Sequence, residues 1–284
     1  MFNSKFEVRN SQSLSGVDSV DALFYNGRAM LRQISLQDSV VYGPIQSRRL
    51  GSSLGINILP LSYKLCSSNC VYCQYGWTLP THPHEPIKRA PELLELIEDA
   101  FQDFAERGTS VDCITLAGNG EPTLHPDLDA LIDGVKQLRD RYFPTAKVGI
   151  LSDATQLQRP QVRAALQQLD VRYMKFDAGD EAMWRMINDP LGRADWTDML
   201  TSLKQLPNVV LQCMFIQGSF DNTGAEHLEH WMGLVGELKP LAVQVYTVDR
   251  APADPGIEKV PQARLEAIAS ELTERTGIPT EVYA

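Results

Sequence analysis

The sequence of 284 residues predicts an α/β fold built on a parallel sheet. Six short apolar segments are each followed by a segment with the apolar spacing of an amphipathic helix, an alternation that is typical of repeated βα units. Such units join parallel strands through right-handed crossovers. Six units are fewer than the eight of a closed barrel, so the count fits either an open doubly wound sheet or a partial barrel.

The predicted elements follow one another from the first strand to the C-terminus. The apolar segment LGINILP (54–60) ends at a proline, as expected of a strand. The helix after it, 91–108, places Leu93 and Ile97 on one face and ends at Gly108. The later strands are predicted at 111–118, 146–153, 171–179, 208–218 and 241–252, and the helices that follow them at 125–143, 159–169, 194–206, 226–238 and 261–277.

The segment before these units is polar and rich in serine. We expect residues 1–40 to form an N-terminal extension, partly helical around DALFYNGRAMLRQ (21–33), before one core domain at 41–284 that includes the C-terminal helix. No apolar run approaches the roughly 20 residues that span a bilayer, and the N-terminus does not resemble a signal peptide. A cytoplasmic location without a membrane partner is therefore expected.

The net charge of the chain indicates which classes of partner it favours. A formal net charge of −10 gives the molecule as a whole no attraction for a phosphate backbone, so nucleic acid is disfavoured as a partner. Basic residues nevertheless flank the segment that contains most of the cysteines. These residues are Arg48, Arg49, Lys64, Lys88 and Arg89. They are as readily explained as scattered surface charges as they are by a local basic patch.

Three of the five cysteines lie close together in CSSNCVYCQYG, called here the cysteine loop (66–76). Without an export signal a disulfide framework is not expected, and thiolates in such a group favour an iron–sulfur cluster, zinc or Cu(I). Zinc would need a fourth ligand, for which His82 and His84 are the nearest candidates, so a non-enzymatic zinc or iron–sulfur module is an alternative. A four-iron cluster would leave one iron open for a ligand. The other two cysteines, Cys113 and Cys213, lie in apolar runs and are predicted to be core residues.

Polar and glycine residues follow three of the predicted strands, at the edge where parallel α/β sheets bind ligands. The second strand ends in a glycine turn (117–121, AGNGE), whose glycines allow close backbone approach. At the third strand's end, Ser152 and Asp153 could hold a ligand, although turn and helix-capping roles explain Ser152 as well. At the fourth strand's end, Lys175 needs a partner in apolar surroundings, and Asp177 lies two residues on, along the same strand face.

The spacing of Cys66, Cys70 and Cys73, with Tyr72 just before the last cysteine, resembles the signature of the radical S-adenosylmethionine (radical SAM) superfamily. The resemblance implies a partial (β/α)6 TIM-like barrel of parallel strands and a [4Fe-4S] cluster whose open iron binds S-adenosylmethionine. A 5′-deoxyadenosyl radical from this cofactor would abstract hydrogen from the substrate. We expect Tyr72 and the residues after the second and third strands to bind the cofactor, and Lys175 and Asp177 to be catalytic. The cofactor-binding residues in those strand ends are Gly118, Asn119, Gly120, Glu121, Ser152 and Asp153, where Asn119 replaces a glycine of the superfamily's glycine–glycine–glutamate stretch.

A closer resemblance runs from Val41 to Arg250. The leader VYGPIQSRRLGSSLGINILP is similar to that of the tRNA wyosine-base synthetases, enzymes that use pyruvate and carry a second cluster on three N-terminal cysteines. This chain has no cysteine before Cys66, and its charge suits tRNA poorly. We therefore expect a small-molecule substrate and a reductant such as flavodoxin or ferredoxin, with a wyosine-type tRNA substrate as the alternative. Arg48 and Arg49 would reach an anionic group near the cluster. Lys175 as an imine-forming amine is a further hypothesis.

Overall fold

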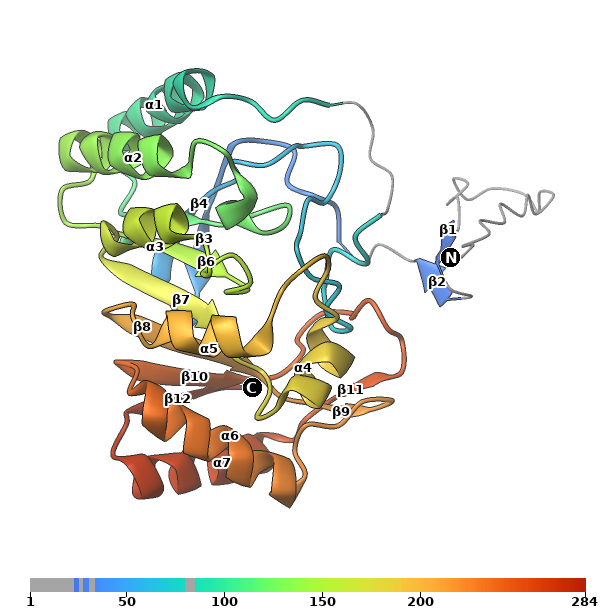
Figure 1. The fold of residues 1–284 in the computed structure, drawn as a ribbon. Helices are drawn as coiled ribbons and strands as arrows, with labels where there is room; N and C mark the ends of the chain where they lie inside the picture. The colour runs from blue at the N-terminus through green and yellow to red at the C-terminus, as the bar shows by residue number, and fades with distance from the viewer. Residues whose placement is uncertain (1–22, 26–27, 31–33, 80–84) are drawn as a thin grey trace.

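The computed structural model describes residues 34–79 and 85–284, together with the backbone of 23–25 and 28–30 (Figure 1). An eight-stranded sheet forms its centre. Neighbouring strands pair in parallel, with one exception: the strand of this sheet that comes first along the chain (Val41–Ser47) pairs antiparallel with the next one (Gly51–Ile56). In spatial order the strands are β12 (Thr280–Tyr283), β10 (Ala242–Tyr246), β8 (Val209–Met214), β7 (Val171–Lys175), β6 (Lys147–Ser152), β5 (Cys113–Leu116), β4 (Gly51–Ile56) and β3 (Val41–Ser47).

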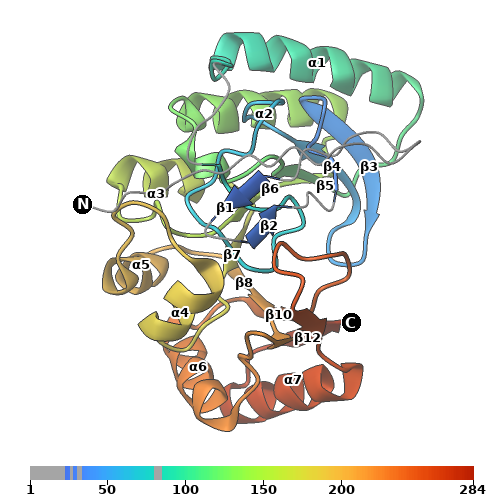
Figure 2. The same ribbon diagram turned by 90° about the vertical axis from the view of Figure 1, so that its right-hand side faces the viewer.

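Helices cover the outer, convex face of this curled sheet. Figure 2 looks onto the carboxyl ends of the strands and shows the helices as an arc around one side of them. One helix follows each of the six predicted strands, and a short helix, α4 (Glu181–Asn188), is added after β7. The predicted partial (β/α)6 barrel is therefore confirmed. The six helices of the repeated units are α1 (Ala90–Glu106), α2 (Leu128–Tyr142), α3 (Pro160–Gln167), α5 (Trp196–Leu203), α6 (Ala225–Leu238) and α7 (Gln262–Thr276).

The two faces of the sheet differ because side chains alternate along each strand. On β4, Leu54 and Ile56 are fully buried in the core formed with the helices. Ser53 and Gly55, between and beside them, line a cavity on the inner, concave face. The same alternation continues along the other parallel strands, so the outer face packs against the helices. The inner face carries a separate apolar cluster, Val171, Tyr173 and Val210, beside polar side chains that line the cavity, such as Thr115 and Gln212. Cys113 and Cys213 are buried, as predicted.

The structure corrects one sequence expectation near the N-terminus. The expected helix around 21–33 is wrong for the residues described there, because β1 (Leu23–Tyr25) and β2 (Arg28–Met30) form an antiparallel pair. Tyr25 pairs with Arg28, which leaves the dipeptide Asn26-Gly27 between the strands, and Asn-Gly is a strong hairpin signal. The rest of the extension lies outside the described residues.

Three further differences concern the carboxyl side of the fold. The predicted strand 208–218 is split, because its last residues form β9 (Ile216–Gly218) and pair antiparallel with β11 (Ile257–Lys259). The C-terminal segment adds β12 to the sheet. A short 3-10 helix, Pro122–Leu124, follows β5. None of the helices in the described part of the chain combines the length and the apolar character needed to cross a bilayer.

Candidate active site

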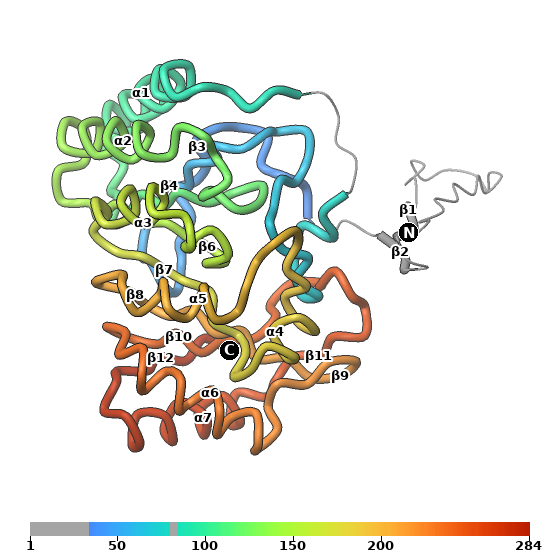
Figure 3. The backbone as a smooth tube through the Cα atoms, in the orientation of Figure 1, coloured from blue at the N-terminus to red at the C-terminus, as the bar shows by residue number. Residues whose placement is uncertain are grey.

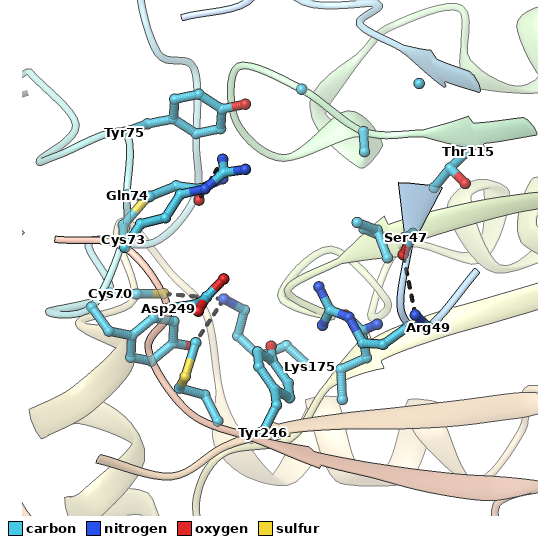
Figure 4. Close-up of a pocket in the computed structure, with 18 of the residues that line it drawn as sticks. Ser47, Arg49, Cys70, Cys73, Gln74, Tyr75, Thr115, Lys175, Tyr246 and Asp249 are labelled. Atoms are coloured by element: carbon cyan, nitrogen blue, oxygen red, sulfur yellow. Dashed lines mark hydrogen bonds between the residues drawn. The ribbon is translucent and has the colours of Figure 1, made fainter. Parts of the chain in front are cut away.

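A cavity of about 530 Å³ opens on the inner face of the sheet, at the carboxyl ends of the strands. The three cysteines of the cysteine loop line it together with Lys175 and Arg49. Figure 4 shows Cys70 and Cys73 on one side of this space, Arg49 on the other, and Lys175 extending from the floor toward Cys70. The structure thus brings together residues that the sequence separates by more than a hundred positions.

Hydrogen bonds from neighbouring strand ends hold the cysteine loop in place. The hydroxyls of Ser67 and Ser68 donate to Oδ2 of Asp153, at 2.9 and 2.6 Å. The backbone N–H of Val71 donates to the carbonyl of Ile187 at 2.9 Å, at the end of α4. Asp153 is buried, and its other carboxylate oxygen accepts two bonds from Thr155. In this structure Asp153 therefore fixes the cysteine loop, although it also lines the cavity.

The glycine turn lies directly against the chain that enters the cysteine loop. Leu65 forms an isolated bridge with Gly120, and a Cβ at Gly120 would lie 1.7 Å from the Leu65 carbonyl oxygen. A Cβ at Gly118 would lie 2.5 Å from Oδ1 of Asn57. Both glycines also have positive φ, 151° and 143°, which side-chain-bearing residues avoid. Gly120 therefore permits the close approach that positions Cys66, and Gly118 permits the close approach of Asn57.

The carboxylate of Glu121 joins the ends of β5 and β6. It is buried and accepts hydrogen bonds from Thr123 N–H at 3.0 Å, Ser152 Oγ at 2.9 Å and Asp153 N–H at 2.6 Å. Burial, followed by the neighbouring charge of Asp153, raises the pKa of Glu121 to about 8. Glu121 and Ser152 both line the cavity, but their polar atoms already have partners within the protein.

Asn119 is the one predicted cofactor-binding residue that the structure does not bring into the cavity lining. Its side-chain amide donates to the carbonyls of Gln37 and Pro60 at 2.9 and 3.0 Å, and its oxygen accepts from Gln37 N–H at 2.8 Å. It therefore anchors the segment before β3 to the glycine turn. Gln37 also donates from Nε2 to the hydroxyl of Tyr75, in the cysteine loop, at 2.9 Å.

A buried polar network connects the cysteine loop to the end of β7. Lys175 Nζ donates to the Tyr72 hydroxyl at 2.9 Å and lies 3.5 Å from Cys70 Sγ, and Tyr72 donates to Asp177. Asn188 Nδ2 donates to Asp177 at 2.7 Å, and the other oxygen of Asp177 accepts from a β8 backbone N–H at 2.8 Å. The predicted partner of Lys175 is thus reached through Tyr72. Lys175 lines the cavity, whereas Asp177 lies behind it.

Electrostatics keep this network charged. Burial acts to lower the pKa of Lys175, but negative charge on Cys70 and Asp177 outweighs it and raises the pKa well above its usual value. Burial raises the pKa of the Cys70 thiol in turn, so the Asp177 carboxylate is the firmer of the two negative partners. The pKa of Tyr72 is raised by burial and by Asp177. Lys175 is therefore an ammonium and Tyr72 a neutral phenol in this arrangement.

Lys64 occupies an equivalent position beside Cys73. Its Nζ donates to the carbonyl of Gly76 at 2.8 Å and lies 3.3 Å from Cys73 Sγ. Burial acts to lower the pKa of Lys64, but negative charge on the cysteine sulfurs, Cys73 first, outweighs it and raises the pKa. Burial also opposes ionisation of the thiols: it raises the pKa of Cys66 and Cys70, whereas Lys64 and its hydrogen bond lower the pKa of Cys73. In the sequence this lysine is recognisable only as one of the charges that flank the cysteine loop. Its place in SYKLC, two residues before the first cysteine, is the signal that was available.

The basic residues around the cysteine loop divide into two groups. Lys88 and Arg89 pair with Glu92 and Asp127 away from the cavity, whereas Arg48, Arg49 and Lys64 line it. Arg48 pairs with Asp249 at 3.5 Å. The Arg49 guanidinium lies 4.6 Å from the centroid of the Tyr246 ring, over the end of β10. A local basic patch therefore exists, but it contains only Arg48, Arg49 and Lys64 of the five flanking basic residues.

The donor set fits a cluster rather than a single ion. Among the described residues, no three histidine, cysteine, aspartate or glutamate side chains converge on a position that would hold one metal ion. His82 and His84, the candidate zinc ligands, lie outside the described residues. Three thiols line one cavity, and two of them each have a lysine ammonium beside them. They provide the soft ligands and the positive surroundings that a [4Fe-4S] cluster needs.

Comparisons with known proteins agree with this geometry. A UPF0026 protein of Helicobacter pylori is 29% identical over 216 residues, which cover 74% of this chain and 67% of that protein. The fold resembles TYW1 with a lysine–pyruvate adduct bound (TM-score 0.56, 16% identity, 79% of this chain and 74% of that chain). It also resembles a radical SAM methyltransferase from Sphaerobacter thermophilus (TM-score 0.59, 15% identity, 92% and 68%).

The family assignment rests on the segment that carries the cysteines. Residues 61–230, more than half of the chain, match the Radical SAM superfamily, and this segment contains the cysteine loop, the glycine turn and Lys175. The chain therefore belongs to the radical SAM superfamily, whose enzymes use a [4Fe-4S] cluster and S-adenosylmethionine.

Proposed function

We propose that this radical SAM enzyme acts on a small anionic molecule that binds in the cavity between Arg49 and Lys175. Once bound, the cluster and S-adenosylmethionine supply a 5′-deoxyadenosyl radical that abstracts hydrogen from the substrate. The observation that carries the proposal is that the three cysteines line the same cavity as the cationic side chains of Arg49 and Lys175.

The residues of the chain divide the work of this reaction. Cys66, Cys70 and Cys73 hold the cluster, and the glycine turn with Ser152 and Asp153 forms the wall against which the cofactor binds. Tyr72 and Asp177 orient the ammonium of Lys175 from behind. The cavity floor excludes bulk water and supplies polar contacts, for example through the Gln212–Gln244 pair, joined by a 2.8 Å hydrogen bond.

The case for an anionic substrate comes from counting which charges are already paired. The Glu121 carboxyl, whose raised pKa of about 8 favours its neutral form, and the Asp153 carboxylate accept bonds from hydroxyls and backbone N–H groups, and Asp249 pairs with Arg48. Arg49 has no carboxylate within ion-pair distance among residues 34–79 and 85–284, and rests on an aromatic ring. A guanidinium in that position is suited to a carboxylate or phosphate.

The radical chemistry is tested without knowledge of the substrate. After anaerobic reconstitution with iron and sulfide, dithionite and S-adenosylmethionine should yield 5′-deoxyadenosine and methionine. Cys66→Ala, Cys70→Ala and Cys73→Ala should each abolish this cleavage, whereas Cys113→Ala, a core cysteine, should retain it. A wild-type protein that binds four irons but never cleaves the cofactor under several reductants would refute the proposal.

The substrate class is tested by deuterium transfer. Deuterated small carboxylates and phosphate monoesters are compared with their neutral methyl esters, and label is sought in 5′-deoxyadenosine. Anions alone should transfer label, and Arg49→Gln should raise their KM by about 10-fold or more, the effect of losing one charge-assisted contact. Arg89→Gln, an exposed arginine far from the cavity, is the control. Equal transfer from the neutral esters would exclude an anionic substrate.

A second candidate uses Lys175 as a nucleophile. The structure of TYW1, to which this fold is similar, was obtained with a lysine–pyruvate adduct bound, and Lys175 lines the cavity here. Its raised pKa favours an ammonium that binds an anion over an amine that attacks a carbonyl. Borohydride reduction in the presence of pyruvate, followed by peptide mass spectrometry, decides between these roles, because the adduct would be covalent and absent from Lys175→Met.

A further inference from the structure

Lys64 is a buried cation whose neighbouring anions are the cysteines themselves. Its side chain is 4% exposed, and its ammonium contacts Cys73 Sγ and the carbonyl of Gly76. Within the part of the chain that the structure describes, no carboxylate forms an ion pair with it. Burying an ammonium without a negative partner is costly, so the site is built for negative charge on the cysteine sulfurs.

Other lysines in the structure have partners of a different kind. Lys204 pairs with Glu237 and Lys88 with Glu92, both at the surface. Lys136 donates to the carbonyl of Gln168 at 2.7 Å, outside the cavity. Lys175 also lies beside a thiol, 3.5 Å from Cys70 Sγ, but its ammonium has the Tyr72 hydroxyl as a second partner in the network that leads to Asp177. Lys64 is therefore distinguished by its burial together with a thiol contact that no carboxylate network in the described structure accompanies.

The position of this ammonium is fixed by the fold of the cysteine loop. Gly76 N–H donates to the carbonyl of Cys73 at 3.0 Å, and Gly76 has a φ of +74°. The turn that these residues form directs the Gly76 carbonyl to Nζ of Lys64 at 2.8 Å. The same turn therefore holds the charge and the sulfur next to each other.

We propose that Lys64 is a positioning residue that raises the reduction potential of the cluster held by the cysteine loop. The inference rests on the proposed function, in which Cys73 is a cluster ligand. One-electron reduction adds one negative charge to the cluster, and a cation fixed at 3.3 Å from a ligand sulfur stabilises the reduced state more than the oxidised state. Hydrogen bonds to ligand sulfurs and local charge are recognised determinants of such potentials.

The test is a redox titration of the reconstituted protein, followed by the electron paramagnetic resonance signal of the reduced cluster. Lys64→Met removes the charge and keeps the length of the side chain, and Lys64→Arg keeps the charge. We expect Lys64→Met to make reduction at least 10-fold less favourable, which for a one-electron couple is a shift of about 59 mV to more negative potential. Lys64→Arg should stay closer to the wild type, and the control Lys136→Met should be unchanged.

Each outcome has a defined meaning. Lys64→Met with a full cluster and the wild-type potential overturns the inference. If Lys64→Met loses the cluster while Lys64→Arg retains it, the potential of Lys64→Arg decides: a value near that of the wild type supports the inference, and a shift of about 59 mV or more to negative potential overturns it. If both variants lose it, Lys64 has a purely structural role and the inference fails. Iron and sulfide content and 5′-deoxyadenosine formation by the wild type test the proposed function separately, so the two failures are distinguishable.

Discussion

Replacing Gly120 by alanine is expected to displace the chain that leads into the cysteine loop. The new Cβ would lie 1.7 Å from the carbonyl oxygen and 2.3 Å from the carbonyl carbon of Leu65, and contacts under 3.0 Å cannot be accommodated without movement. Those atoms are backbone, so no flexible side chain can yield. Residue 120 also has a φ of +143°, which alanine adopts only with strain.

The two effects together give a large expected loss. Overpacking costs about 1–3 kcal/mol and the strained φ a similar amount, so the free energy of unfolding should fall by about 4 kcal/mol. Gly108→Ala is the matched control, because Gly108 has a φ of +69° but nothing within 4 Å of its Cβ position. It should lose about 1 kcal/mol, since it has the strain without the overlap.

Urea unfolding of the cofactor-free proteins, followed by circular dichroism, measures both losses. Iron content after reconstitution is the second readout, because movement of Leu65 displaces Cys66 directly. Gly120→Ala should hold less iron than Gly108→Ala. If both variants unfold at the same urea concentration and hold equal iron, the close approach of Leu65 to the glycine turn does not position the cysteines, and the reasoning is refuted.

Three other predictions test separate parts of the site. Tyr72→Phe removes the hydroxyl between Lys175 and Asp177 and should lower the free energy of unfolding by about 2 kcal/mol, against about 1 kcal/mol or less for Tyr75→Phe, which loses one partly exposed hydrogen bond; equal losses in urea would contradict the network. The folded pKa of Glu121, about 8, lies above its ordinary value of 4.5, so folding takes up a proton between these two pH values. The contribution of Glu121 to the free energy of unfolding is therefore fully present below pH 4.5 and is lost as the pH rises through 8. Urea titrations across that range should show a flatter dependence for Glu121→Gln, and an unchanged slope would count against the buried carboxyl. With a net charge of −10, the protein should show no salt-dependent binding of tRNA in a filter-binding assay, and tight binding that weakens with salt would favour the wyosine-type alternative.

The periodic parts of the fold were predictable from local patterns. Apolar strands and amphipathic helices repeat with periods of 2 and 3.6 residues, so the βα units and the burial of Cys113 and Cys213 follow from short windows of sequence. The grouping of the cysteine loop with the end of β7 also followed, because parallel strands place their carboxyl ends at one edge.

The residues that the sequence analysis missed act over long distances along the chain. Asn188 contacts the Tyr72 hydroxyl at 3.1 Å across 116 positions and lies in α4, a short helix that was not among the predicted elements. The partner of Asn119 could not be predicted either, because its side chain bonds to Gln37, 82 positions away. Such pairings depend on how the segments pack, and no local pattern contains them.

The segments at the rim of the cavity are also joined by contacts between residues that lie far apart in the sequence. The cysteine loop and the segment after β10 run side by side (Figure 3), joined where Asp254 N–H donates to the carbonyl of Val71 at 2.8 Å and where Arg250 donates to Gln74 at 3.3 Å. Strands predicted separately therefore meet through their loops.

The alternation of faces along the strands has a consequence for how such an enzyme can change. Gln212 lines the cavity and is held by a hydrogen bond from its Nε2 to Gln244, whereas its neighbour Leu211 is fully buried against the helices. A substitution at Gln212 alters what the cavity accepts and leaves the helix-packing contacts intact. Selectivity and foldability are thus encoded at interleaved positions, so this scaffold can acquire a new substrate by changing every second residue of a strand while its architecture persists.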